Sequence, residues 1–545
     1  FSSEWTTSDR FGFVRRCVVH NEGRSFATLS LLDGIQNVMP GGLARRFHAE
    51  FSTLADAYRE SELEPETGLA LFRLSSIPTD KAEPNESLRV TVAWSRGLPS
   101  PRVLLCNAQV GGFRVGAEVR EETRVRGRRG AFLLSSVLAL SPGESRAWIV
   151  VADVHQDAAD VAATRALLRG AVDPVAEVAR DVERGTRRLF AMVAGADGLQ
   201  LTADVLACRR HFSNTLFNIM RGGTPDRGMT VTREDFADFL SAASSRVAAR
   251  QEAFVRGLPE SLTHTELLAR ASRTGDPHLE RLAHEYLPLA FSRRHGDPSR
   301  PWNSFAIELK DERGRRVTGY QGNWRDIFQN WEALGLSFPS YIESMIFKFL
   351  DASTADGYNP YRVTREGFDW EIIDEDDPWS FIGYWGDHQV VYLLKLLELS
   401  VRHHPGALEE LLRRRLFTFA NVPYRIAPYE RLLADPWRTI EFDPALHDRI
   451  QRDTAALGTE AKFLADAEGL PIRASLAEKL VLVALTKLCN FVPEAGIWMN
   501  TQRPEWNDAN NALVGNGASV VTLCYLRRFL VFLSGLATSG GEGDL

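Results

Sequence analysis

Two patterns of hydrophobic and polar positions divide the chain. From Phe11 to about Val154, short runs rich in Val, Leu and Phe alternate with polar positions and are separated by turn residues. Alternation with a period of two is typical of half-buried strands, and several short strands at this spacing predict a β-sandwich over residues 1–154. No strand is evident before Phe11, which favours a sequence that starts inside a longer protein.

The second pattern begins near residue 155, where Ala, Val, Arg, Asp and Glu recur at helical spacing and predict a helical linker over 155–200. From 201 to 545 helix signals alternate with irregular, aromatic-rich loops, and no sheet is expected. Long helices joined by long loops favour an α/α toroid over a bundle, because bundles have short connections. The predicted helices cover 201–220, 233–255, 262–271, 276–290, 340–350, 388–402, 406–416, 445–467, 474–489 and 518–537.

Composition favours a globular protein over nucleic-acid-binding, disulfide-rich and membrane-spanning classes. A chain of 545 residues with 44% hydrophobic residues predicts two or three globular units. The net charge of −7 gives no basic footprint for nucleic acid. Five widely spaced cysteines without a C-x-x-C pattern favour buried thiols over disulfides or zinc. The apolar stretches 480–485 and 520–536 are too short or are broken by Arg527 and Arg528, so no membrane partner is expected.

The compartment is weakly determined. The chain begins at Phe1 rather than Met, so a removed leader or a longer precursor stays open, with the cytoplasm slightly favoured. A homodimer is also left open.

The richest candidate chemistry lies between Asn500 and Gly517, where an acid, amides and an indole share a glycine-bounded loop. A carboxyl group held against an indole can have its pKa raised by desolvation, so Asp508 is a candidate general acid. Amide groups can bind sugar hydroxyls. The alternative is a capped helix start, because an apolar helical pattern follows from about Ser519. Candidate substrate-binding residues here are Trp498, Arg503, Glu505, Trp506, Asn507, Asn510 and Asn511.

The segment Trp506-Asn507-Asp508 resembles the segment that carries the catalytic acid in the cellobiose phosphorylase-like family of six-hairpin (α/α)6-barrel glycosidases. Two further stretches agree with this resemblance. The residues 322–332 are similar to the family's Arg-Asp-x-x-Gln segment, which implies that Asp326 grips the sugar beside the cleaved bond, and Asp387-His388 resembles the Asp-His at the start of another barrel helix. The resemblance adds Trp324, Arg325, Gln329 and His388 as substrate-binding candidates.

The resemblance implies a fold that is multidomain β + α. An N-terminal β-sandwich domain (1–154) and a helical linker (155–200) would precede an (α/α)6-type barrel (201–545). The short remainder of the chain after Asp508 leaves open that this barrel is incomplete.

The expected activity is cleavage of a glycosidic bond in an oligosaccharide or polysaccharide, with Asp508 protonating the leaving oxygen. If water attacks, an inverting hydrolase needs a second carboxylate about 6.5–9.5 Å from the acid, and Asp387 is the first candidate. If phosphate attacks, an anion pocket is needed, for which Arg316 is a candidate. No match to a phosphate site is found after Asp508, so hydrolysis is slightly favoured.

A catalytically silent carbohydrate-binding barrel stays open as a different class of function, because fold alone does not give function. No cofactor is expected. No metal is expected either, because the histidines have no metal spacing and the acidic run 371–377 favours a solvated loop over a calcium site. The sequence leaves the sugar, the linkage and the identity of the catalytic base open.

Overall fold

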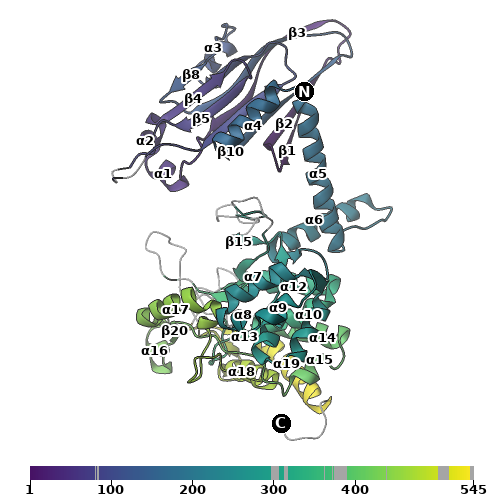
Figure 1. The fold of residues 1–545 in the computed structure, drawn as a ribbon, viewed down its shortest axis with the longest axis vertical. Helices are drawn as coiled ribbons and strands as arrows, with labels where there is room; N and C mark the ends of the chain where they lie inside the picture. Colours follow the sequence, from purple (N-terminus) through teal and green to yellow (C-terminus); the bar gives the residue numbers. More distant parts are fainter. Residues whose placement is uncertain are drawn as a thin grey trace. The chain divides into compact units, whose positions relative to one another are not determined.

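The chain folds into two compact units, Phe1–Ala191 and Met192–Leu545 (Figure 1). The computed structural model describes residues 1–79, 82, 85–295, 306–307, 309–311, 317–360, 362–370, 372, 389–436, 438–500 and 515–539. The first unit is built on β-sheet and the second on α-helix.

The strands of the first unit form two antiparallel sheets. A seven-stranded sheet has the order β1-β2-β10-β6-β5-β4-β8, and a three-stranded sheet has the order β3-β9-β7. The strands are β1 (Ser2–Ser8), β2 (Gly12–His20), β3 (Ala27–Val38), β4 (Arg59–Glu64), β5 (Leu69–Leu74), β6 (Val90–Arg96), β7 (Arg102–Cys106), β8 (Arg124–Arg126), β9 (Gly130–Leu140) and β10 (Ser145–Gln156). The helices beside them are α1 (Arg45–Glu50), α2 (Ser52–Ala57), α3 (Val110–Arg114), α4 (Ala158–Arg169) and α5 (Pro174–Gly195), whose last residues belong to the second unit.

The two sheets share one apolar core. Trp148 of the large sheet and Phe132 of the small sheet belong to the same buried cluster. On its other face the large sheet presents Trp94 to Val161 of α4 and Val178 of α5. Burial of a large apolar side chain contributes roughly 1.5–3 kcal/mol, so the two clusters hold both sheets and the first part of α5 in one body.

The sheet-rich N-terminal third expected from the alternating pattern is confirmed, but the expectation of no strand before Phe11 is wrong. Residues Ser2–Ser8 form β1, which pairs with β2 along its whole length from Ser2↔Val18 to Ser8↔Gly12. This strand lies at the edge of the sheet and its residues are mostly exposed and polar. It therefore lacks the alternation that marks a half-buried strand.

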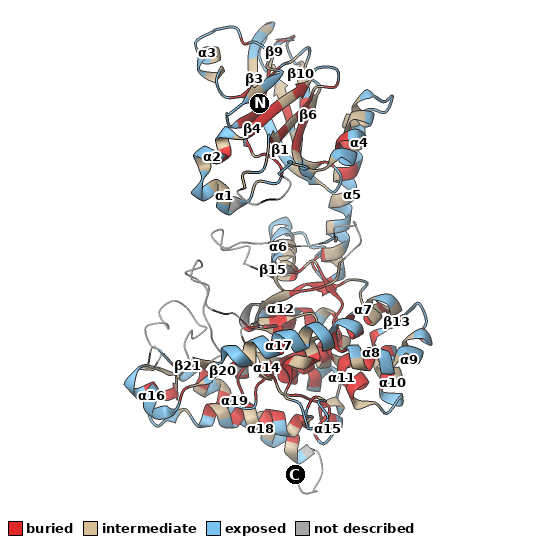
Figure 2. Ribbon diagram, turned by 60° about the vertical axis from the view of Figure 1, so that its left-hand side comes forward, coloured by how far each residue is buried: buried red, intermediate tan, exposed pale blue. Residues whose placement is uncertain are grey.

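The second unit contains long helices in a largely helical interior (Figure 2). The helices are α6 (Val205–Gly222), α7 (Arg233–Ala243), α8 (Ser245–Arg250), α9 (Glu252–Arg256), α10 (His264–Arg273), α11 (Pro277–Glu285), α12 (Trp324–Ser337), α13 (Ile342–Asp351), α14 (Gln389–His403), α15 (Ala407–Leu411), α16 (Tyr429–Ala434), α17 (Pro444–Leu457), α18 (Leu476–Leu488) and α19 (Val520–Ser539). Short 3-10 helices cover Pro339–Tyr341 and Thr459–Lys462.

Short antiparallel ribbons join these helices, so the expectation of no sheet after residue 200 is wrong. Each strand has only two or three residues, too few for the sequence pattern to reveal. The pairs are β11 (Thr224–Pro225) with β14 (Leu289–Ala290), β12 (Thr230–Thr232) with β13 (Ser261–Thr263), β15 (Arg293–His295) with β16 (Ala306–Ile307), and β20 (Tyr424–Ile426) with β21 (Ile440–Phe442). Two ribbons have three strands: β17 (Gln321–Asn323), β18 (Arg362–Thr364) and β19 (Phe368–Asp369), and β22 (Phe491–Val492), β23 (Gly496–Trp498) and β24 (Ala518–Ser519).

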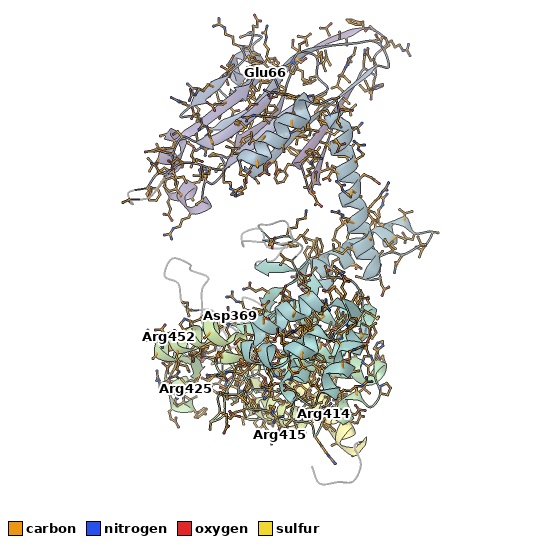
Figure 3. The ribbon with its side chains drawn as sticks, viewed as in Figure 1. Glu66, Asp369, Arg414, Arg415, Arg425 and Arg452 are labelled. Atoms are coloured by element: carbon orange, nitrogen blue, oxygen red, sulfur yellow. The ribbon has the colours of Figure 1, made fainter. Side chains whose placement is uncertain are left out.

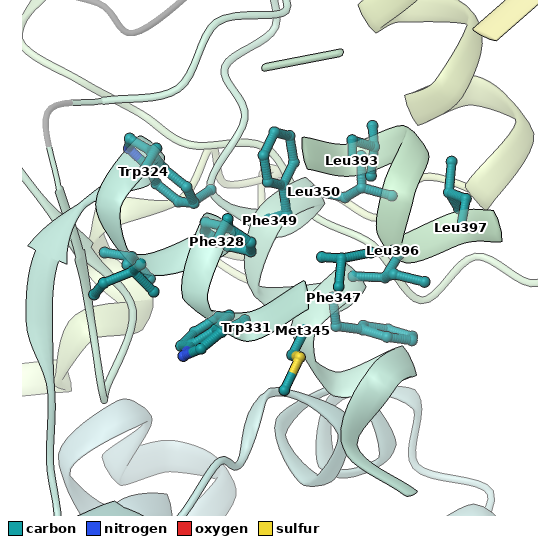
Figure 4. Packing of buried hydrophobic residues seen from close by; sticks show 14 of the residues in the cluster. Trp324, Phe328, Trp331, Met345, Phe347, Phe349, Leu350, Leu393, Leu396 and Leu397 are labelled. Carbon is teal, nitrogen blue, oxygen red and sulfur yellow. The ribbon is translucent and has the colours of Figure 1, made fainter. Parts of the chain in front are cut away.

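The largest core of the second unit lies between α12, α13 and α14 (Figure 4). Phe328 and Trp331 of α12, Phe349 of α13, and Leu393 and Leu396 of α14 are all fully or almost fully buried. Trp331 also donates a hydrogen bond from Nε1 to the carbonyl oxygen of Gly222 at 2.8 Å, which attaches α12 to the end of α6. These three helices therefore form the rigid frame of the unit.

The last helix, predicted over 518–537, is α19, and Arg527 and Arg528 lie within it. By length and composition alone, Val520–Thr538 could cross a membrane, which is weak evidence by itself. Within this unit α19 is anchored, because Arg528 forms an ion pair with Glu398 of α14 at 2.5 Å and Phe529 is fully buried.

The cysteines are only partly buried as expected. All five are free, and Cys17 and Cys106 are buried, but Cys208 is half-buried and Cys489 and Cys524 are exposed. Burial raises the pKa of the Cys17 thiol to about 11, so this thiol stays protonated.

Candidate active site

The start of α12 is fixed by its first residue, Trp324. Strand β17 leads directly into this helix. The indole stacks on Phe328 with ring centroids 5.2 Å apart, meets Phe349 edge-on at 5.6 Å, and donates from Nε1 to the carbonyl oxygen of Pro360. At 2% exposure the ring packs in the core of the unit, and its role in substrate binding stays a prediction.

The other residues of this motif follow in the first turns of α12. Arg325 and Asp326 belong to the helix backbone, while their side chains lie outside the described part of the structure. Gln329 is exposed, whereas Phe328 and Trp331 of the same helix are buried.

Helices α12 and α14 run in the same direction. Lys395, before the middle of α14, forms an ion pair of 2.7 Å with Glu332 in the middle of α12. About one turn further along both helices, a Cβ on Gly335 of α12 would lie 3.6 Å from Cδ1 of Leu399 of α14. Because the contacts advance along both helices together, Trp324 and Gln389 start their helices at the same end of the unit. Asp387 and His388, which directly precede α14, lie outside the described residues.

The loop that carries Asp508 is closed at its base. Strand β23 pairs with β24 through Ile497↔Ser519 and Trp498↔Ala518. Beyond this pair, Gly515 donates to the carbonyl oxygen of Met499 at 2.7 Å, and Trp498 donates from Nε1 to the carbonyl oxygen of Gly515 at 2.9 Å. The half-buried indole of Trp498 thus holds the loop base.

The tip of this loop lies outside the described residues. It contains seven of the residues singled out from the sequence: Arg503, Glu505, Trp506, Asn507, Asp508, Asn510 and Asn511. The same applies to the anion candidate Arg316 and to most of the acidic run 371–377.

A short segment, 358–360, connects the two motifs. The hydroxyl of Tyr358 lies 3.3 Å from Nδ2 of Asn500, at the base of the Asp508 loop. Asn359 is fully buried and donates to the carbonyl oxygen of Phe349 at 3.0 Å, and Pro360 accepts the hydrogen bond of Trp324. The start of α12 and the base of the loop are therefore attached to the same three residues.

Sequence reasoning missed this segment. The only signal is the turn composition of Asp356-Gly-Tyr-Asn-Pro360. Gly357 has φ +81°, and a Cβ there would lie 2.0 Å from Oγ1 of Thr486, so the turn requires glycine. Nothing in that composition indicates that Tyr358 contacts Asn500, because 142 positions separate them.

Buried charges surround the end of α13. Burial and the neighbouring Glu285 raise the pKa of Asp351 well above its usual range, while Asp351 also accepts a hydrogen bond from the backbone of Thr418 at 2.8 Å. Burial lowers the pKa of Lys479 to about 7, and its ammonium group donates to the carbonyl oxygens of Ser353 and Thr418. These hydrogen bonds join the end of α13 to Thr418 and to Lys479 of α18, so the network stabilises the packing of the helices.

A polar cavity of about 410 Å³ lies elsewhere in the second unit. One lining residue, Asp235, accepts a hydrogen bond from the Thr318 hydroxyl at 2.6 Å and pairs with Arg365 at 3.0 Å. Its lining includes the carboxylates Asp226, Glu234, Asp235, Asp238 and Asp311. Among the residues that the structure describes, no three His, Cys, Asp or Glu side chains are grouped to hold a metal ion.

Arg414, labelled in Figure 3, forms an ion pair of 2.5 Å with the buried Glu280 of α11. Arg425, in β20, pairs with Glu441 of β21 at 3.0 Å nearer the surface. An exposed pair such as the second contributes little to stability, typically less than about 1 kcal/mol.

Part of the second unit is similar to a known protein domain. Residues 226–288, which begin directly after β11 and end just after α11, match Glycoside hydrolase family 149 insertion domain 1. A comparison with curated proteins gives no significant match. The matched segment includes α7, α10 and α11, and its residues Asp235 and Tyr286 line the polar cavity. The match supports a glycoside hydrolase family and a carbohydrate substrate: the protein is an enzyme, a glycoside hydrolase or glycoside phosphorylase.

Proposed function

We propose that the protein cleaves a glycosidic bond of an oligosaccharide or polysaccharide, with Asp508 as the general acid. Two independent observations support this. Residues 226–288 match a domain of a glycoside hydrolase family. The loop between Asn500 and Gly515 carries an acid, amides and an indole on a closed base, which is a composition suited to sugar hydroxyls and a leaving oxygen.

The observation that carries the proposal is the shared attachment of two motifs to residues 358–360. The start of α12 hydrogen-bonds Pro360, and the base of the Asp508 loop hydrogen-bonds Tyr358. Helix α14, which follows Asp387, starts at the same end of the unit as α12. This arrangement supports the convergence of Asp326, Asp387 and Asp508 on one cleft, as a single glycosidic bond requires.

The attacking group decides between two reactions, and the family match favours phosphate. Members of glycoside hydrolase family 149 are phosphorylases. In phosphorolysis a phosphate oxygen forms the new bond to the anomeric carbon while the bond to the leaving sugar breaks, and the proton of Asp508 goes to the leaving oxygen. No catalytic base is then needed, so Asp387 would bind substrate instead of activating water. We therefore place phosphorolysis ahead of the inverting hydrolysis that the sequence slightly favoured.

Product analysis tests this proposal. The chain is incubated with a panel of α- and β-linked gluco-oligosaccharides, with and without inorganic phosphate, and the products are separated by anion-exchange chromatography. Phosphorolysis gives a sugar 1-phosphate only when phosphate is present. Free reducing sugar without phosphate would assign hydrolysis instead. Saccharide binding with no cleavage under either condition would contradict the proposal and favour a silent carbohydrate-binding barrel.

A further inference from the structure

Tyr358 occupies a rigid turn after α13. The Oγ1 atom of Thr354 accepts a hydrogen bond from the Tyr358 backbone N–H at 3.2 Å, and the Thr354 N–H donates to the Tyr358 carbonyl oxygen at 2.8 Å. The ring is 4% exposed and lies 5.0 Å from the ammonium group of Lys487. The position of the Tyr358 hydroxyl is therefore set by packing and by the backbone, independently of the residues that it contacts.

This hydroxyl contacts both sides of the β22–β23 ribbon. It lies 3.3 Å from Nδ2 and 3.4 Å from Oδ1 of Asn500, and it accepts from Nδ2 of Asn490 at 3.4 Å. Asn490 directly precedes β22, and Asn500 is the last residue described before the Asp508 loop. One buried hydroxyl thus fixes the entry to that loop.

The neighbouring residues fix the other side of the proposed cleft. Asn359 ties the segment to α13 through the carbonyl oxygen of Phe349, and Pro360 ties it to the first residue of α12 through Trp324. Asp326 is only two positions beyond Trp324. Residues 358–360 therefore contact both the base of the Asp508 loop and the start of α12.

We propose that Tyr358 is a positioning residue for glycosidic cleavage, which holds the Asp508 loop through Asn500 at a fixed place relative to α12. This inference rests on the proposed function. The hydroxyl does not touch the reacting atoms in this assignment; it acts through Asn500, at the base of the loop that carries the proposed acid. A misplacement of about 1 Å can lower a rate by about 10²-fold, so loss of the hydroxyl should be visible in turnover.

The first test is Tyr358→Phe, which keeps the ring and removes the hydroxyl. We expect kcat on an unactivated oligosaccharide to fall about 10- to 100-fold, with a smaller change in KM. On a glycosyl fluoride, whose leaving group needs no proton, the rate should stay within about twofold of the unmodified protein. Equal losses on both substrates would overturn the positioning role, since general damage to the fold does not depend on the leaving group.

Tyr341→Phe is the matched control. Its hydroxyl is also buried and donates to the carbonyl oxygen of Gly228 at 3.0 Å, but it lies at the start of α13, away from the loop base. It should lower stability without lowering kcat at a temperature where the protein stays folded. If Tyr341→Phe lowered kcat as much as Tyr358→Phe, the inference would be overturned.

Asn500→Ala approaches the same contact from the loop. Combined with Tyr358→Phe it should cause no further loss of kcat, because both changes remove one connection; independent, multiplying losses would overturn the inference. Asp508→Asn separates the two proposals. If Asp508→Asn is inactive while Tyr358→Phe turns over normally, only the positioning role fails. If Asp508→Asn turns over normally, the proposed acid itself fails.

Discussion

The hydroxyl of Tyr286 donates a hydrogen bond of 2.5 Å to Oδ2 of Asp235, which joins the end of α11 to the first turn of α7. The same carboxylate accepts from Thr318 and pairs with Arg365, so it ties the segment 226–288 to two parts of the chain outside that segment. Burial and the nearby Asp235 raise the pKa of Tyr286 well above its usual range, which keeps the hydroxyl a donor.

Asp235→Ala should lower the free energy of unfolding by about 2–4 kcal/mol, because two hydroxyl donors and Arg365 lose their acceptor. Urea unfolding followed by tryptophan fluorescence measures the change. Asp238→Ala is the control, because Asp238 is exposed on the same helix and lines the same cavity. It should change stability by less than about 0.5 kcal/mol. Similar losses in the two variants would contradict the role given to Asp235.

Acid should destabilise the second unit through its buried histidines. Burial lowers the pKa of His264 and His284 from 6.5 to about 3, with a further contribution to His284 from the charge of Arg414. Below pH 6.5 the unfolded chain binds protons that the folded chain excludes. Stability is therefore fully present above pH 6.5 and falls as pH drops towards 3, by about 1.4 kcal/mol per pH unit for each histidine.

His284→Phe tests this dependence. The His284 ring stacks on Phe347 with centroids 4.3 Å apart and planes 6° from parallel, so a phenyl ring keeps that contact. Urea unfolding at several pH values between 7.5 and 5 should show an unchanged slope near pH 7.5 and a slope reduced by about 1.4 kcal/mol per pH unit near pH 5. His403→Phe replaces an exposed histidine and should leave the slope unchanged. An unchanged slope in His284→Phe would contradict the assignment.

How far the sequence predicts the fold depends on the length of each helix or strand. Most strands of the first unit are long enough for apolar and polar residues to alternate visibly, so the sequence predicts a sheet there. The predicted helix 233–255 is divided, because the Ser244 side chain accepts a hydrogen bond from the Val247 N–H and caps a new helix. The predicted helix 445–467 ends early at Gly458, where φ is +87° and a Cβ would lie 2.6 Å from the carbonyl oxygen of Ala242. The break at Ser244 is a local cap, whereas the break at Gly458 depends on a contact far away in the chain.

Helix α12 was missed although its pattern is present. Its buried residues Trp324, Phe328, Trp331 and Leu334 recur at helical spacing. The polar residues between them resemble a sugar-binding motif, which masks the helical spacing. For the site, the sequence identified Trp324 and Asn500 as parts of two motifs, but the contacts through 358–360 that connect them depend on tertiary packing.

Gly515→Ala should disturb the base of the Asp508 loop. Gly515 has φ +74°, and a Cβ there would lie 2.1 Å from Cβ of Pro436. Gly406→Ala is the matched control, because Gly406 has φ +91° with open space around it. The left-handed conformation alone costs alanine about 1–2 kcal/mol, so Gly406→Ala should lose that much stability. Gly515→Ala should lose more and should also lose kcat, as measured by thermal unfolding and turnover; equal behaviour would contradict a packed loop base.

Asp508→Asn should abolish turnover of an unactivated oligosaccharide while folding and saccharide binding stay nearly intact. The amide keeps the shape and hydrogen-bonding capacity of the carboxyl group but has no proton to transfer, so the loss should appear in kcat rather than in ground-state affinity. General acid catalysis is worth about 10²- to 10⁴-fold, which sets the smallest loss to expect. Asp326→Asn is the comparison, because a charged acceptor for sugar hydroxyls would be lost and binding should weaken as well. Steady-state kinetics and calorimetric titration of the same oligosaccharide separate the two effects. Near-normal kcat in Asp508→Asn would remove this residue from the acid role, and weakened binding in Asp508→Asn with unchanged binding in Asp326→Asn would reverse the roles given to the two carboxylates.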